Sequence, residues 1–330
     1  MRNQKNFKEK ILEILISKRE PVSGQEISSK MGVSRAAVWK YIETLRDEGY
    51  RIDGVSNRGY KLVVSPDLLN PSEIKPYLPP DFSAEIYWSR SIDSTNEKAK
   101  ELARAGAANG TLVVAETQLR GRGRRGREWQ SPPGGIWFSV ILRPQVSALQ
   151  ASRVSIFAAV VVAEEIAAAT GVRAAIKWPN DILVDDKKVC GILIELAAEL
   201  EQISYIVVGI GINANISTRQ LSPDVSETAT TLMEATGKKI NRQRLLAKIA
   251  GRLINELPGI FGDGYRDYLE RWRRLSAVLG RQVRIEDSGK TFMGKAVDIE
   301  ENGALAVELD SGKRRIFESG EVSLRIDDKY

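Results

Sequence analysis

Three patterns in the 330-residue sequence predict an α+β protein made of several domains. The first pattern is a basic N-terminal segment in which three helical repeats of apolar residues precede a β-rich hairpin. The second is a central region in which strands and helices follow one another without strict alternation, which predicts a mixed or antiparallel sheet. The third is a C-terminal run of short strands separated by turns, which suits a small SH3-like β-barrel.

Residues 1–64 follow the plan of a winged helix-turn-helix domain. Apolar residues at helical spacing predict three helices, the third capped by Ser34, and the β-rich runs 50–53 and 60–63 predict a hairpin, or wing. Residues 1–61 contain 13 Lys and Arg but 8 Asp and Glu, so most of the chain's net charge of +6 lies here. A basic end on a nearly neutral body indicates nucleic-acid binding, and a three-helix protein-binding module is the alternative.

In such a domain the start of the third helix enters the major groove, and the wing reaches the DNA backbone. The predicted helix-turn-helix spans Gly24 to Glu43. The candidate DNA contacts are polar residues left on the outer face of the third helix and in the wing: Ser34, Arg35, Lys40 and Arg58.

Proline content predicts the domain boundaries. Five of the chain's 12 prolines fall within residues 65–81, which predicts a semi-rigid linker after the first domain. Residues 82–276 form the predicted second domain, with strands such as 111–115 and a long, buried helix over 152–170. Residues 277–330 form the predicted SH3-like domain.

Composition excludes several classes of function. No apolar run approaches the ~18 residues of a membrane span, and the N-terminal segment lacks the core of a signal peptide. The single cysteine, Cys190, permits no intramolecular disulfide, so we expect a cytoplasmic protein. The absence of histidine excludes Ser-His-Asp catalysis and histidine zinc sites, so any chemistry must use Arg, Lys, carboxylates, backbone amides or a metal with oxygen ligands.

The segment from Arg120 to Arg127 contains five arginines, three glycines and no acidic residue. Because burying an unpaired guanidinium is prohibitive, this Arg/Gly loop is predicted to be exposed and cationic. Its pattern Gly121-x-Gly123-x-x-Gly126 matches the dinucleotide fingerprint, but residues 127–135 cannot open the helix that the fingerprint requires. A solvated basic loop and a loop that closes over nucleotide phosphates are the two other interpretations, and the loop alone does not decide between them.

Four motifs occur in order along the chain: Ser94-Thr-Asn96, Gln118 to Gly126 with Trp129, Lys177-Trp-Pro-Asn-Asp181 followed by Lys188, and Gly209-Ile-Gly-Ile-Asn213. Together with the three-domain order, these motifs resemble the bifunctional biotin protein ligases, which also repress their own biosynthetic operon. The resemblance runs from residue 1 to about residue 326. It implies a class II synthetase-like mixed α/β catalytic domain in a bacterial, cytoplasmic protein.

The resemblance implies a reaction in two steps. The carboxylate of biotin attacks the α-phosphate of ATP, with Mg²⁺ as the expected metal, and gives biotinoyl-5'-AMP and pyrophosphate. A lysine of a biotin carboxyl carrier protein then attacks the mixed anhydride. The adenylate-bound enzyme would pair as a homodimer on operator DNA and repress biotin synthesis genes. No enzyme nucleophile is needed, which agrees with a chain that lacks histidine.

By the same resemblance, the four motifs supply the site residues. The expected biotin contacts are Ser94, Thr95, Asn96, Gln118, Gly121, Arg122, Gly123, Arg124 and Lys188. The expected catalytic residues are Arg124, Lys188 and Asp181, and the expected nucleotide contacts are Arg122, Arg124, Trp129 and Asn213. The residues expected to be solvated are Arg120, Arg125 and Arg127, and Lys187 is expected to point away from the site because strand residues alternate.

These assignments have structural and functional alternatives. Ser94 can cap a helix and Asp181 can be a turn residue, while Trp129 can belong to the core and Asn213 can end a strand. The functional alternatives are a non-catalytic, ligand-sensing repressor and a lipoate-type ligase, which shares this catalytic fold. The Arg/Gly loop and the motif at residues 177–181 favour biotin as the substrate.

Overall fold

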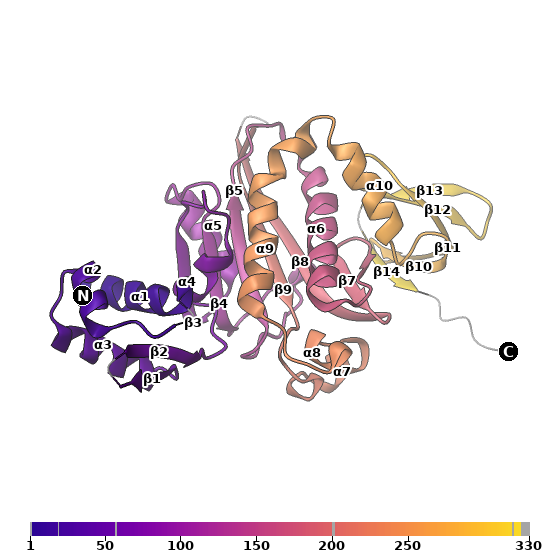
Figure 1. The fold of residues 1–330 in the computed structure, drawn as a ribbon. Coiled ribbons are helices and arrows are strands. Elements are labelled where there is room, and N and C mark those ends of the chain that lie inside the picture. The colour runs from indigo at the N-terminus through magenta and orange to yellow at the C-terminus, as the bar shows by residue number, and fades with distance from the viewer. Residues whose placement is uncertain (1, 19, 57, 200–201, 319, 325–330) are drawn as a thin grey trace. The chain divides into compact units, whose positions relative to one another are not determined.

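The computed structural model describes residues 2–18, 20–56, 58–199, 202–318 and 320–324. The chain forms two compact units, Met1–Leu78 and Pro79–Tyr330, and each is described here by itself (Figure 1). In the part of the chain that is described, no helix has both the length and the apolar character needed to cross a membrane.

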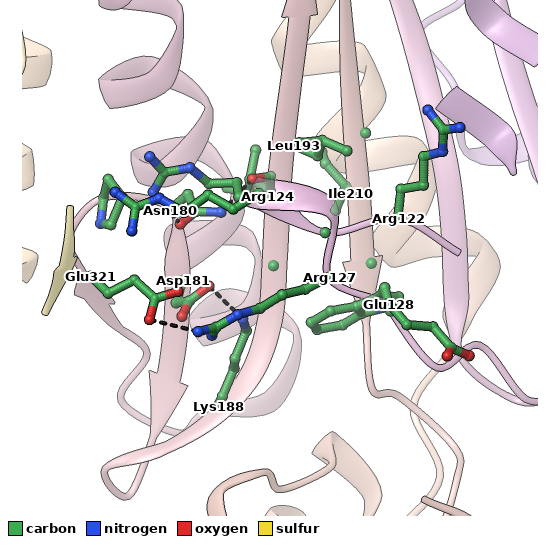
Figure 2. Close-up of a pocket in the computed structure, with 18 of the residues that line it drawn as sticks. Arg122, Arg124, Arg127, Glu128, Asn180, Asp181, Lys188, Leu193, Ile210 and Glu321 are labelled. Atoms are coloured by element: carbon green, nitrogen blue, oxygen red, sulfur yellow. Dashed lines mark hydrogen bonds and ion pairs between the residues drawn. The ribbon is translucent and has the colours of Figure 1, made fainter. Parts of the chain in front are cut away.

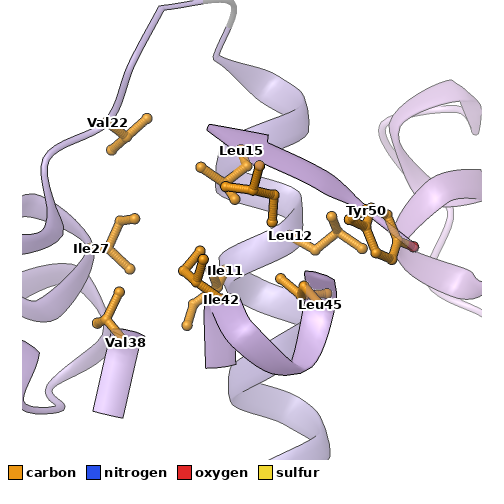
Figure 3. Packing of buried hydrophobic residues seen from close by; sticks show 10 residues of the cluster. Ile11, Leu12, Leu15, Val22, Ile27, Val38, Ile42, Leu45 and Tyr50 are labelled. Carbon is orange, nitrogen blue, oxygen red and sulfur yellow. The ribbon is translucent and has the colours of Figure 1, made fainter. Parts of the chain in front are cut away.

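The first unit has the elements of a winged helix-turn-helix domain, as the sequence predicts (Figure 1). Helices α1 (Arg2–Ser17), α2 (Gly24–Met31) and α3 (Arg35–Asp47) precede the antiparallel strands β1 (Arg51–Val55) and β2 (Gly59–Val64). The apolar faces of the helices meet in one core (Figure 3). Its central side chains, all buried, are Ile11, Leu15, Ile27, Val38, Ile42 and Leu45.

Capping residues define the turn between α2 and α3. Ser23 precedes α2 and Ser34 precedes α3, and each side chain accepts a hydrogen bond from the backbone amide three residues later, at 3.0 and 3.2 Å. Gly32 ends α2 in the left-handed conformation, with φ of 64°, which favours glycine. The first residue of α3, the end expected to face DNA, is therefore set by local chemistry.

The wing is anchored to the segment before α2. Val22 and Tyr60 exchange two backbone hydrogen bonds of 2.8 Å. Gly59 has φ of 102°, and a Cβ atom at this position would lie 2.1 Å from the carbonyl oxygen of Val22. Only glycine fits at this close approach, so the base of the wing has one defined position.

The proline-rich segment 65–81, which the sequence predicts to be a semi-rigid linker, is folded over most of its length. Residues up to Leu78 belong to the first unit, and Leu69 is fully buried. The short helix α4 (Pro71–Ile74) is capped by Asn70. Proline suits the first turn of a helix, where its missing N–H has no partner to lose. The apolar residues between the prolines can therefore pack into the core.

The second unit is built on a seven-stranded sheet with the order β3-β4-β5-β9-β8-β7-β6. The strands are β3 (Ile86–Ile92), β4 (Leu112–Gln118), β5 (Ile136–Leu142), β6 (Ala175–Lys177), β7 (Asp181–Val184), β8 (Lys187–Glu199) and β9 (Gln202–Ile212). Strands β3 and β4 are parallel, and the other neighbouring pairs are antiparallel. The sheet is therefore mixed, as predicted.

Helices pack against this sheet. Helix α5 (Thr95–Arg104) contacts β4, β5 and β9, whereas α6 (Ser152–Thr170) contacts β6 to β8 and α9 (Arg242–Asn255) contacts β5. Figure 1 shows α6 and α9 side by side along the strands. Consecutive residues of β4 and β5 are fully buried, so both faces of these strands are covered. The short helices α7 (Pro223–Thr228) and α8 (Leu232–Thr236), which the sequence analysis does not predict, follow β9.

A smaller antiparallel sheet ends the second unit, and it fits the predicted SH3-like domain. Helix α10 (Tyr265–Leu275) leads into it, and the strand order is β13-β12-β11-β10-β14. The strands are β10 (Gln282–Asp287), β11 (Lys290–Ile299), β12 (Leu305–Leu309), β13 (Arg314–Phe317) and β14 (Glu321–Leu324). This sheet packs on the larger one, since Trp178 Nε1 donates a hydrogen bond to the Gly303 carbonyl oxygen at 3.0 Å.

A buried ion pair joins α9 to the sheet. The Arg242 side chain is 1% exposed, and its Nη2 lies 3.3 Å from Glu116 Oε2 in β4. Arg242 Nη1 also donates to the Gly135 carbonyl oxygen at 2.6 Å, and Trp88 Nε1 donates to Glu116 Oε1 at 3.2 Å. Buried charges are tolerated when they are paired and hydrogen-bonded in this way. The network holds the end of β4, where the Arg/Gly loop begins.

Candidate active site

The sequence motifs meet at a cavity of about 270 Å³ in the second unit (Figure 2). The expected site residues that line it are Ser94, Thr95, Asn96, Gln118, Arg122, Gly123, Arg124, Trp129, Asp181 and Lys188. A second cavity of about 1100 Å³ adjoins the first, because both are lined by Trp129, Asp181 and Lys188. The second cavity contains Asn213, and the site thus has two connected compartments.

Neutral hydrogen-bonding groups line one end of the first cavity. Ser94 caps α5, accepting from the Glu97 amide at 3.5 Å, and it also lines the cavity, so the capping role does not exclude a ligand contact. The Gln118 carboxamide is fixed from two sides. Its Oε1 accepts from the amide and hydroxyl of Thr95 at 2.8 and 3.1 Å, and its Nε2 donates to Ser131 Oγ at 2.8 Å. These contacts hold the carboxamide at the cavity wall.

The first glycine of the Gly209-Ile-Gly-Ile-Asn213 motif makes room for Asn96. A Cβ atom on Gly209 would lie 1.9 Å from Asn96 Oδ1. The Asn96 side chain has partners inside the protein: its Nδ2 donates to Glu195 Oε2 at 3.0 Å, and its Oδ1 accepts from Ser139 Oγ at 2.6 Å. Asn96 therefore ties the start of α5 to the strands below it as well as lining the cavity.

The second glycine of this motif makes room for Trp129. The indole lies on the backbone of β8 and β9, where a Cβ on Gly211 would be 2.4 Å from Trp129 Nε1 and a Cβ on Gly191 would be 2.9 Å from its ring. Trp137 meets the indole edge-on, with ring centres 6.4 Å apart. Trp129 is thus packed as a core residue on one side, and it also lines both cavities. Its packing in the core therefore does not exclude a contact with the nucleotide.

The glycines of the Arg/Gly loop let the loop fold back on itself. Gly121 is buried, and a Cβ atom at this position would lie 2.2 Å from the carbonyl oxygen of Trp129. The backbone amide of Trp129 donates a hydrogen bond to the carbonyl oxygen of Gly121 at 2.9 Å. The Gly123 amide donates to the Arg127 oxygen at 2.7 Å. After Gly126 no helix follows, so the pattern is not a dinucleotide fingerprint. Gly121 lies behind the cavity wall and does not line it.

Two arginines of the loop that are expected at the ligand have different surroundings. Arg124 is half-buried, and its Nη1 donates to Asn180 Oδ1 at 3.3 Å. Burial, followed by the charge of Arg125, lowers the pKa of Arg124, yet an arginine stays charged at any working pH. Arg122 is 55% exposed and pairs with Glu97 of α5, and Figure 2 shows it directed away from the other labelled basic groups.

The three arginines expected to be solvated are exposed, but two of them also lie near an acidic side chain. Arg125 is exposed, and Arg120 is 83% exposed with its Nη1 3.9 Å from Asp93 Oδ2. Arg127 differs from the expectation: its Nη2 donates to Glu321 Oε2 at 2.7 Å, as Figure 2 shows. The partner lies 194 residues further along the chain, in β14. Hydrophobic periodicity and motif spacing carry no signal for such a distant pair.

Lys188 and Asp181 form an ion pair inside the cavity. Lys188 Nζ lies 2.7 Å from Asp181 Oδ1 and 5.1 Å from the centre of the Trp129 ring (Figure 2). The two residues come from the neighbouring strands β8 and β7. Lys187 is exposed and does not line the first cavity, as the alternation of strand residues predicts, but it does line the second cavity together with Lys188.

Asn213 closes the second cavity from the end of β9. Its side chain is 3% exposed, and Nδ2 donates to the Thr230 carbonyl oxygen at 3.1 Å. Its backbone amide donates to the Val189 oxygen at 2.9 Å. Asn213 therefore ends the strand and lines the second cavity, together with apolar residues of the α7 region such as Val225.

Strand β14 supplies a wall of the first cavity that the sequence analysis does not identify. Residues Gly320 to Ser323 line it, with Glu321 facing the Arg/Gly loop. The strand has four residues and lies beyond the last strand that the pattern predicts. Nothing in the residue pattern singles out Glu321 among the chain's 43 Asp and Glu residues.

The cavity offers few ligands for a resident metal. Within the described residues no group of three His, Cys, Asp or Glu side chains could hold a metal ion. Three carboxylates line the first cavity: Asp181 is paired with Lys188, Glu321 is paired with Arg127, and Glu128 is exposed. Mg²⁺ commonly takes one or two carboxylates and completes its shell with water and substrate phosphates. These donors fit a magnesium ion that arrives with a nucleotide.

Comparison with known families gives one match for each part of the chain. The profile of the biotin/lipoate A/B protein ligase family matches residues 88–213. An HTH domain profile matches residues 8–61, and the profile of the biotin protein ligase C terminal domain matches residues 278–325. The three matches follow the order in which the domains are predicted.

Individual proteins show the same similarity over most of the chain. The bifunctional ligase/repressor BirA of Bacillus spizizenii is 39% identical over 308 residues, which cover 90% of this chain and 92% of that protein. The BirA of Escherichia coli is 33% identical over 317 residues, which cover 96% of both chains. A structure of the biotin protein ligase from Aquifex aeolicus in complex with biotin and ATP aligns with a TM-score of 0.62 and 32% identity, over 73% of this chain and 98% of that chain.

The fold and the site, together with these similarities, define a class: a protein ligase that carries a helix-turn-helix domain at one end. Within that class, the chain belongs to the bifunctional ligase/repressor BirA family. Membership of this family excludes the dinucleotide-binding interpretation of the glycine pattern and leaves the loop as part of a ligase site.

Proposed function

We propose that this chain is an ATP-dependent biotin protein ligase that also acts as a biotin-responsive repressor of biotin synthesis genes. The observation that carries the proposal is the meeting of four separate motifs at one two-compartment cavity. The names of its relatives, which include biotin ligases and bifunctional ligase/repressors, support the same function. In the first step a biotin carboxylate oxygen bonds to the α-phosphorus of ATP, the bond to pyrophosphate breaks, and biotinoyl-5'-AMP forms.

The biotin ring suits the neutral end of the first cavity. A ureido ring has two N–H donors and a carbonyl acceptor, and Ser94, Thr95 and Gln118 present hydroxyl and carboxamide groups of both kinds. Asn96, Gly121 and Gly123 support this end through the packing described above. The acid group would then point toward Lys188, at the junction of the two compartments.

The charged groups at the junction suit the adenylation step. The attacking carboxylate and the α-phosphate are both anions, so the approach needs fixed positive charge. Lys188 supplies it, and Asp181 holds the ammonium group in place at 2.7 Å. Arg124 supplies a second, half-buried cation, whereas Arg122 must leave Glu97 before it can reach a ligand. Orientation and charge are the whole requirement, because the substrate itself is the nucleophile.

The nucleotide suits the second compartment. Trp129 lies between the cavities and offers an aromatic surface, and Asn213 lies at the end of the second cavity with a carboxamide. Mg²⁺ would be held by the ATP phosphates, with Asp181 as the nearest carboxylate, and would neutralise phosphate charge. In the second step the amine of a carrier-protein lysine bonds to the acyl carbon and AMP leaves.

An adenylation assay separates this function from its alternatives. The full chain is incubated with ATP, MgCl₂ and either biotin or lipoate, and the bound product is identified by mass spectrometry. Biotinoyl-5'-AMP should accumulate with biotin, and lipoyl-AMP should be absent or rare. Formation of lipoyl-AMP in place of biotinoyl-5'-AMP would support the lipoate-type ligase. If neither acid gave an adenylate, the result would support the non-catalytic, ligand-sensing repressor.

The repressor function requires the first unit. We propose that the adenylate-bound chain forms a homodimer in the bacterial cytoplasm and places two copies of α3 in successive major grooves of a two-fold operator. Deleting residues 1–78, the whole first compact unit, should abolish operator binding in a mobility-shift assay while adenylate formation persists. DNA affinity equal to that of the full chain would contradict the two-part organisation.

A further inference from the structure

The outer face of α3 carries a large aromatic side chain that the sequence analysis does not assign to DNA binding. Trp39 is 56% exposed, whereas Val38 and Ile42 on the same helix are fully buried. Its neighbours along the exposed stripe, one turn apart on the helix, are Arg35 and Ala36. An indole among polar residues contributes nothing to the core of the first unit, so its placement calls for another explanation.

Trp39 lies in a groove whose walls are fixed before any partner binds. The groove is lined by α3, by the first residues of α2 and by the wing, and the aromatic ring of Tyr60 forms part of it. The Ser34 cap sets the start of α3, and the Val22–Tyr60 hydrogen bonds set the wing. Because both walls are anchored, the indole is presented at a defined place between helix and wing.

The chemistry of the groove favours DNA as its occupant. Residues 1–61 carry a surplus of five positive charges, and Arg35 and Lys40 flank Trp39 on the exposed face. These cations suit phosphate, but an uncharged indole does not. In the major groove the one strongly apolar feature of a base edge is the 5-methyl group of thymine. Trp39 is the fifth residue of α3, within the N-terminal half of the helix that contacts base edges in this type of domain.

We propose that Trp39 is a specificity-determining residue, which reads thymine methyl groups of the operator through apolar contact while Arg35 and Lys40 hold the adjoining phosphate backbone. The small Ala36 beside it allows the helix to approach the base edges closely. This proposal rests on the proposed DNA-binding function of the first unit, and it adds which residue discriminates between bases and what chemical group it recognises.

A methyl-deletion experiment tests this inference on the full chain with biotin, ATP and MgCl₂. Binding sites are first selected from a randomised duplex library. Each thymine of the selected site is then replaced by uracil, which removes the methyl group alone. At one or two positions uracil should weaken binding by the wild-type chain about fourfold, the effect of one buried methyl group. The same replacements should leave the affinity of the Trp39→Ala variant unchanged, because this variant should no longer prefer thymine at those positions.

Matched variants keep the outcome unambiguous. Because Trp39 is exposed, Trp39→Ala should retain the wild-type Tm and adenylate formation. Lys40→Ala should weaken selected and random duplexes to a similar extent and should keep the thymine preference. The proposal would be overturned if uracil weakened DNA binding equally in the wild type and in Trp39→Ala. It would also be overturned if Trp39→Ala lost the same affinity for random DNA as for the selected site. A wild-type chain that selects no sequence would overturn the DNA-binding function together with it.

Discussion

Replacing Lys188 by alanine should slow the formation of biotinoyl-5'-AMP by about 10²–10³-fold, the usual effect of removing one preorganised group that stabilises developing charge. The reason is the position of its ammonium group at the junction of the two cavities, 2.7 Å from Asp181 and 5.1 Å from the centre of the Trp129 ring. Without this cation, one of the charges that offset the repulsion between the carboxylate and the α-phosphate is lost. Rapid-quench measurement of adenylate after mixing with biotin and ATP gives the rate directly.

Lys187→Ala is the matched control for this prediction. It removes the same charge from the neighbouring residue of the strand, but from an exposed side chain at the rim of the second cavity. Its loss should stay below about tenfold, because exposed charges interact weakly with their surroundings. Asp181→Asn should give an intermediate loss, since the ammonium remains but is no longer held. Equal losses for the two lysine variants would remove the role assigned to Lys188.

The second large effect is expected for Gly211→Ala, which should weaken ATP binding about 10- to 100-fold. The added Cβ would lie 2.4 Å from Trp129 Nε1, so the indole must leave its place on β8 and β9. Stacking of a base on an aromatic side chain contributes about 1–3 kcal/mol to the binding free energy, and ATP would lose this contribution if Trp129 were displaced. Isothermal titration of the chain with ATP measures the change.

A double-mutant cycle distinguishes loss of the Trp129 position from general damage to the sheet. In a Trp129→Ala background the extra methyl group of Gly211→Ala meets open space, so it should cause little further loss. Gly259→Ala is a suitable control, because a Cβ at Gly259 has no neighbouring atom within 4 Å. If Gly211→Ala weakened ATP binding as much in the Trp129→Ala background as in the wild type, the role assigned to Gly211 would be contradicted.

Local rules account for the parts of the fold that could be predicted from sequence. Apolar spacing and capping residues locate α2 and α3 closely, since Ser23, Gly32 and Ser34 act within their own helices. The long apolar helix α6 has the predicted bounds, because continuous burial leaves a continuous apolar run. The class of the sheet also follows, since its strands and helices do not alternate regularly.

Features that depend on distant parts of the chain could not be predicted in this way. The segment 65–78 looks like a linker because prolines are counted locally, whereas its packing depends on the core of the first unit. The pairing of Arg127 with Glu321 and the buried pair of Arg242 with Glu116 each join residues more than 100 positions apart. Helices α7 and α8 are too short for a periodic signal.

The candidate site shows the same division. The motifs indicate which residues gather, but not why the second and fourth motifs need glycines. The structure supplies the reasons: Gly209 faces Asn96, Gly211 faces Trp129, and Gly121 faces the Trp129 carbonyl. It also distinguishes the arginines, since Arg124 is half-buried at the cavity whereas Arg122 is held by Glu97. The roles of these residues in binding biotin and nucleotide stay predictions for the experiments above.

The wall formed by β14 has a consequence for how the protein is made. Ribosomes deliver the chain from its N-terminus, so the winged helix-turn-helix emerges and can fold long before Glu321 is synthesised. A nascent or prematurely terminated chain would carry the DNA-binding unit but would lack one side of the cavity and the partner of Arg127. Such fragments should therefore bind a ligand in the first cavity more weakly than the full chain does, even though their DNA-binding unit is present.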